Sequence, residues 1–138
     1  MREQQEHTFS THDGVELFYR HWPATAGVGP RKAILLFHRG HEHSGRIAHL
    51  VDELGLPEFD FFAWDARGHG QSLVTEGPYS IEQLGRDVIA LLDALDIQKA
   101  HFCGLSMGGL IGQWLGIHAG ERLQRLVVCN TCLLYTSP

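Results

Sequence analysis

The feature that most constrains the fold of this chain is a series of short apolar runs separated by stretches of helical periodicity. The run AILLF (33–37) is continuously apolar, which is typical of a strand buried on both faces of a sheet. The runs FDFFAW (59–64), AHFCGL (100–105) and RLVVCN (125–130) predict further strands, and helical spacing is found at 47–54, 81–95 and 107–118. Because parallel strands need helical crossovers, this alternation predicts an α/β fold with a mostly parallel sheet and helices on both faces.

The first part of the chain differs from this alternation. Asp13 and Gly14 separate two short stretches, which is a hairpin signal, and Val15, Leu17 and Tyr19 lie on one face of the second stretch. We therefore expect an antiparallel hairpin at the N-terminus. The 138 residues show no internal repeat and no interdomain linker, so residues 1–131 are expected to form one domain.

Charge and hydropathy narrow the classes of partner. The formal net charge is −5, and no block of Lys or Arg is present, which argues against a surface for nucleic acid or anionic membrane. The start MREQQEHTFS has no apolar core of a signal peptide, and no apolar run is long enough for a membrane span, so we expect a cytoplasmic protein. The odd count of cysteines (Cys103, Cys129 and Cys132) favours buried reduced thiols over a disulfide framework.

The stretch HFCGLSMGG (101–109) carries the strongest functional signal. Gly104, Ser106 and Gly108 form a Gly-x-Ser-x-Gly pattern between a predicted strand and a predicted helix, which is the context of a nucleophile elbow. Ser106 is the candidate nucleophile, and the backbone N–H of Met107 is a candidate oxyanion donor. The alternative is a glycine-rich turn that contains a serine with no chemical role.

A second oxyanion donor is expected after the strand at 33–37. The segment FHRGHEHSGR places the N–H of Arg39 or Gly40 in the position where such a loop belongs. The competing interpretation is a metal site, but no further cluster completes a zinc shell, so we predict no metal and no organic cofactor. That alternative would use His38, His41, Glu42 and His43.

With these motifs placed, the chain resembles the α/β-hydrolase superfamily. Residues from about 67 to 131, RGHGQS through VVCNT, resemble the 3-oxoadipate enol-lactonases. Residues 1 to about 72 resemble the serine aminopeptidases and monoacylglycerol-lipase-like hydrolases, whose loop reads His-Gly-x-x-Glu-His-Ser-x-Arg. In this chain Arg39 stands where that pattern has glycine. The resemblance implies the N-terminal part of an α/β-hydrolase fold.

The two resemblances meet at RGHGQS, which both groups share. This predicts a chimera joined near residues 67–72, and the alternative is a single divergent hydrolase. The last seven residues, CLLYTSP (132–138), resemble the translation of an adapter used in sequencing libraries, and we predict that they form a non-native tail.

The resemblance implies a parent enzyme of aromatic catabolism, in the β-ketoadipate pathway, that hydrolyses 3-oxoadipate enol-lactone with Ser106 as nucleophile. A general carboxylesterase or monoacylglycerol-lipase-like enzyme is one alternative, and an inactive fragment or binding module is another. In this superfamily the acid and the histidine follow the serine, yet no Asp follows Ser106 here. His118 lies about 18 Å along the predicted helix. The chain itself is therefore predicted to be inactive; its oligomeric state is not predicted.

Overall fold

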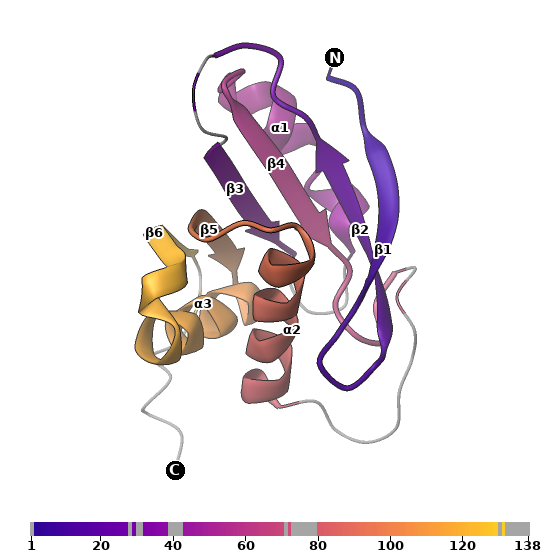
Figure 1. Ribbon diagram of the computed structural model, residues 1–138, viewed down its shortest axis with the longest axis vertical. Coiled ribbons are helices and arrows are strands. Elements are labelled where there is room, and N and C mark those ends of the chain that lie inside the picture. The colour runs from indigo at the N-terminus through magenta and orange to yellow at the C-terminus, as the bar shows by residue number, and fades with distance from the viewer. Residues whose placement is uncertain are drawn as a thin grey trace.

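The computed structural model describes residues 2–27, 29, 32–38, 43–70, 72, 80–129 and 131. Within these residues, six strands form a single sheet in the order β1-β2-β4-β3-β5-β6 (Figure 1). The strands are β1 (Gln5–Ser10), β2 (Glu16–Trp22), β3 (Lys32–Phe37), β4 (Phe59–Trp64), β5 (Ala100–Leu105) and β6 (Leu123–Cys129). The helices are α1 (His49–Leu54), α2 (Ile81–Ala94) and α3 (Met107–His118), with short 3₁₀ turns at Ser44–Arg46 and Gly120–Arg122.

The sheet has an antiparallel edge and a parallel centre. β1 pairs antiparallel with β2, and β2 pairs antiparallel with β4, whereas β4, β3, β5 and β6 run parallel. Gly14, with a φ of 80°, provides the left-handed position of the turn between β1 and β2. The predicted N-terminal hairpin and mostly parallel sheet are confirmed.

Helices cover both faces of the sheet, as predicted. Leu35 and Phe62 point to the face that carries α2 and α3, and there they join a core with Leu91 and Ile111. The neighbouring Leu36 points to the opposite face and packs in a second cluster with the segment around α1. Because strand side chains alternate between faces, apolar runs such as AILLF supply both clusters at once. The residues before and after RGHGQS share the first core.

Local signals in the sequence explain where two of the helices begin or end. The Ser80 hydroxyl accepts a hydrogen bond from the Gln83 N–H at 3.0 Å and caps the N-terminus of α2. Gly55, with a φ of 60°, ends α1 in the left-handed region. α1 begins at His49 rather than Ile47, because the 3₁₀ turn at Ser44–Arg46 precedes it. No helix among the described residues is both long and apolar enough to cross a bilayer.

Candidate functional site

Ser106 lies at the junction of β5 and α3 in a strained backbone conformation. Its φ is 57° and its ψ is −110°, values that residues with a Cβ rarely adopt. The Ser106 N–H donates to the Cys129 carbonyl of β6 at 2.8 Å, and the Ser106 carbonyl accepts from the Gly109 N–H at 2.9 Å. Hydrogen bonds on both sides therefore fix this residue between the sheet and the first turn of α3.

Glycines allow α3 to lie directly against the sheet. A Cβ on Gly104 would stand 2.1 Å from the carbonyl oxygen of Gly108, and a Cβ on Gly108 would stand 3.0 Å from the Cβ of Phe37. On the next turn of the helix, a Cβ on Gly112 would stand 2.8 Å from Leu126 of β6. The first and third glycines of the Gly-x-Ser-x-Gly pattern thus permit the sharp turn that presents Ser106.

Of the candidate oxyanion donors, only Met107 lies among the residues that the structure describes. Met107 follows Ser106 directly and is the first residue of α3, so its N–H lies at the positive end of this helix. The first N–H groups of a helix have no partner within the helix, which leaves this N–H able to donate to an oxyanion. Arg39 and Gly40 lie outside the described residues. His41 and Glu42 of the competing metal-site interpretation also lie outside them.

Both flanks of the segment 39–42 are tied to the end of β4. On one side, the Nε2 atom of the fully buried His38 accepts from the Ala66 N–H at 3.0 Å. On the other side, the Ser44 N–H donates to the buried Asp65 carboxylate at 2.6 Å. The Nε2 atom of His38 and the Nδ1 atom of His43, which accepts from the Gly45 N–H at 3.1 Å, are therefore engaged and unavailable to a metal.

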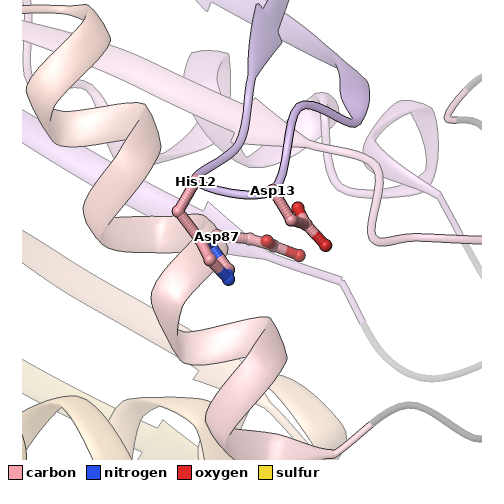
Figure 2. Close-up of side chains that lie close together, drawn as sticks. All are labelled: His12, Asp13 and Asp87. Carbon is pink, nitrogen blue, oxygen red and sulfur yellow. The ribbon is translucent and has the colours of Figure 1, made fainter.

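A second group of titratable side chains lies between the β1–β2 turn and α2. Ligand atoms of His12, Asp13 and Asp87 lie within 4.8 Å of one another, and Figure 2 shows the three side chains converging. The buried guanidinium of Arg67 donates to both carboxylates, at 2.6 Å to Asp13 and 2.7 Å to Asp87. Because a cation of the chain already occupies this position, we interpret the cluster as an ion-pair network.

The sequence contains a signal for this network that was not used above. Asp87 lies on the stripe of α2 that Leu84, Val88 and Leu91 bury against the sheet. A carboxylate on a buried helical stripe needs a cationic partner, and Arg67 is that partner. His118, by contrast, lies at the far end of α3 with its ring 4.8 Å from that of Trp114, which agrees with its predicted separation from Ser106.

The strain at Ser106 leads to a stability prediction. Ser106→Gly is expected to raise the free energy of unfolding by about 1 kcal/mol, because glycine adopts a positive φ without the Cβ penalty and loses part of that gain through its freer unfolded chain. Urea unfolding followed by circular dichroism measures the change. Ser106→Ala is the matched control, since alanine keeps the Cβ and removes only the hydroxyl. A Ser106→Gly variant less stable than Ser106→Ala would contradict the strain argument.

Comparison with known proteins places this geometry among hydrolases. A family model described as serine aminopeptidase, S33, matches residues 29–138. 3-Oxoadipate enol-lactonase 2 of Acinetobacter baylyi is 62% identical over 68 residues, which are 49% of this chain and 26% of that protein. The uncharacterized protein YnbC of Escherichia coli is 66% identical over 67 residues, which are 49% of this chain and 11% of that protein.

The fold comparison agrees with the sequence comparison. The crystal structure of the enol-lactonase from Burkholderia xenovorans matches with a TM-score of 0.79 and 38% identity, covering 91% of this chain and 46% of that one. The chain spans less than half the length of each of these three relatives. Its strands and helices correspond to part of a larger fold.

Proposed function

The chain belongs to the serine aminopeptidase S33 family of α/β-hydrolases, and on this premise we propose that the complete protein hydrolyses carboxylic esters or lactones through Ser106. The observation that carries the proposal is the strained Ser106 between β5 and α3, with a φ of 57°. A strand-turn-helix of this kind presents a serine hydroxyl at the carboxyl edge of a parallel sheet, where open α/β folds bind ligands.

The substrate that we propose is 3-oxoadipate enol-lactone. The 62% identity to an enol-lactonase over 68 residues supports it. Ser106 Oγ would attack the lactone carbonyl, and the Met107 N–H would stabilise the oxyanion. Cleavage of the ring C–O bond would leave an enol within the acyl-enzyme, and this enol would take up a proton on carbon to become the ketone. Water would then hydrolyse the acyl-enzyme to 3-oxoadipate. The acid and histidine that activate Ser106 would come from the part of the enzyme that this chain does not span.

A general carboxylesterase or monoacylglycerol-lipase-like hydrolase is the second candidate. It is favoured by the family model, which describes serine aminopeptidases and matches from residue 29 onward. The two candidates are separated by assaying the complete enzyme on the enol-lactone, on short-chain chromogenic esters and on a monoacylglycerol. Turnover of the esters alone would replace the lactonase proposal with this one.

The role of Ser106 is tested in the same complete enzyme. Ser106→Ala is expected to lower kcat by at least about 10³-fold, because the acyl-enzyme no longer forms. Ser80→Ala is the matched control, since Ser80 caps α2 and should affect stability without affecting chemistry. Retention of full activity in Ser106→Ala would exclude nucleophilic catalysis by this residue.

The 138-residue chain alone is expected to show no esterase or lactonase turnover above its own Ser106→Ala variant. The reason is chemical: a serine without a positioned base is a weak nucleophile at neutral pH. An assay at high protein concentration with a chromogenic acetate ester measures it. Turnover that depends on Ser106 would show that this chain carries its own base, and the prediction would then be wrong.

We also propose that the chain joins parts of two hydrolases near residues 67–72. Two relatives above 60% identity each cover 49% of the chain, whereas the structural match that covers 91% of it is only 38% identical. A junction would give high identity to each parent over one part of the chain and lower identity to any one relative over nearly all of it, and these values agree with that expectation. Sequencing one uninterrupted DNA molecule from the Met1 codon past Thr131 tests this, and a continuous frame that ends in CLLYTSP would refute both the junction and the non-native tail.

A further inference from the structure

Three basic side chains gather near the amino ends of the parallel strands, far from the nucleophile. β3, β5 and β6 are neighbours in the sheet (Figure 1), and they carry Lys32, His101 and Arg125 respectively. His101 is the second residue of β5 and Ser106 follows the last one. At about 3.3 Å per residue, this separates the two by about 16 Å along the strand. The three basic side chains therefore form a group distinct from the candidate nucleophile.

Lys32 and His101 are connected through the ring of Phe59. His101 is aligned with Ile34 of β3, and Lys32 lies two residues before Ile34, so these side chains point to one face of the sheet. Ile34 and Phe59 pack with the cluster around α1, which identifies the face. The Lys32 Nζ atom lies 5.6 Å from the centroid of the Phe59 ring. The ring centroids of Phe59 and His101 are 5.7 Å apart.

Arg125 lies on the same face, beside His101. The aligned pairs on either side of His101 place Leu123 and Leu126 of β6 before and after it. Both leucines pack in the core on the side of α2 and α3. Arg125 lies between them and is exposed, so the alternation of side chains directs it to the face of α1. Three adjacent strands therefore bring two cations and an imidazole together.

This group has no anion to balance it. Within the part of the chain that the structure describes, no carboxylate lies within ion-pair distance of Lys32 or Arg125. Burial and repulsion from Arg125 and Lys32 lower the pKa of His101, so its imidazole is neutral at pH 7 and can donate one ring N–H. Two neighbouring cations repel each other, and this repulsion is present although the whole chain has a net charge of −5. An anion between them would remove it.

We propose that Lys32, His101 and Arg125 bind a phosphate group. The charges match, because a phosphate monoester carries about −1.5 to −2 at pH 7 and the site offers two positive charges. The donors match as well: an ammonium, a guanidinium fork and an imidazole N–H face three acceptor oxygens. A single carboxylate has one negative charge and would leave one cation unbalanced. The site does not use Ser106, so it is independent of the proposed hydrolysis.

Isothermal titration calorimetry of this chain with inorganic phosphate, at physiological ionic strength, is expected to show saturable one-to-one binding. Lys32→Gln and Arg125→Gln should each weaken it at least about 10-fold, the effect of losing one charge-assisted hydrogen bond. His101→Phe keeps a ring, removes the donor and should weaken binding about 3-fold or more. Arg86→Gln removes a positive charge from α2, on the opposite face, and should bind as tightly as the parent.

A second measurement uses the unaltered side chains, so the proposal does not depend on the folding of any variant. Phosphate should raise the urea midpoint of the parent chain more than chloride does at the same ionic strength. Phenyl phosphate is the second probe: tighter binding than inorganic phosphate would support an organic phosphate as the ligand, and equal binding would support the free ion.

Three results would overturn the phosphate site. The first is the absence of saturable binding in the parent chain. The second is an equal loss of affinity in Arg86→Gln and Arg125→Gln, which would reveal a non-specific effect of charge. The third is binding by this chain but not by the complete enzyme, which would mean that a segment outside this chain fills the site.

Discussion

Gly104→Ala is expected to lower the free energy of unfolding by about 3 kcal/mol, one of the two largest effects predicted for a single substitution in this chain. The added Cβ would stand 2.1 Å from the carbonyl oxygen of Gly108 and 2.4 Å from its carbonyl carbon. Both contacts are backbone atoms in the first turn of α3, and that turn cannot move without displacing Ser106. No change of rotamer relieves the clash.

A graded series of glycine variants makes this prediction sharp. Gly112→Ala meets the Leu126 side chain at 2.8 Å, which can adjust, so its cost should be about 1 kcal/mol. At Gly120 an added Cβ meets nothing within 4 Å, and the change should stay within about 0.5 kcal/mol. Urea unfolding of the three variants measures the order. Equal costs at Gly104 and Gly120 would show that the turn has room for a side chain and would remove the argument for its tightness.

Much of the fold could be predicted because its local signals agree with the final packing. The predicted strands FDFFAW and AHFCGL and the predicted helix at 107–118 have the same bounds in the structure. Each is a strong apolar pattern, so burial and local preference favour the same state. The last strand begins at Leu123, two residues before the predicted run, because pairing with β5 extends it.

Features that depend on the register of distant strands could not be predicted. The placement of Cys103 and Cys129 on one face of the sheet follows from the pairing of β5 with β6, which no local pattern specifies. The anchoring of Ser44 by Asp65 likewise joins two loops after different strands. Asp13 was interpreted only as a turn residue, although its carboxylate also accepts from Arg67.

Arg67→Ala is expected to cost about 3 to 5 kcal/mol, which is the typical cost of removing one partner of a buried ion pair. The Arg67 side chain is 1% exposed and donates through Nε and Nη2 to Asp87 and through Nη1 and Nη2 to Asp13. Its loss would leave the fully buried Asp87 carboxylate without a cation and would release the β1–β2 turn from α2. Arg86→Ala, which breaks an exposed pair with Glu82, is the matched control and should cost less than about 1 kcal/mol.

The pH dependence of the stability lost in Arg67→Ala distinguishes an electrostatic contribution of Arg67 from a contribution of its packing. Hydrogen bonds from Arg67 and Thr11 hold the pKa of Asp13 well below its usual range, so the stability from this carboxylate is present above its ordinary pKa and is lost as the pH falls toward the folded value. Burial raises the pKa of Asp87, and without Arg67 that carboxyl would take up a proton more readily. Because of both effects, the difference in the free energy of unfolding between the parent and Arg67→Ala should become smaller on acidification from pH 7 to pH values below about 4. Urea unfolding of both proteins across this pH range measures the direction of the change. A difference in unfolding free energy that stays constant with pH would mean that Arg67 stabilises the fold through its packing alone.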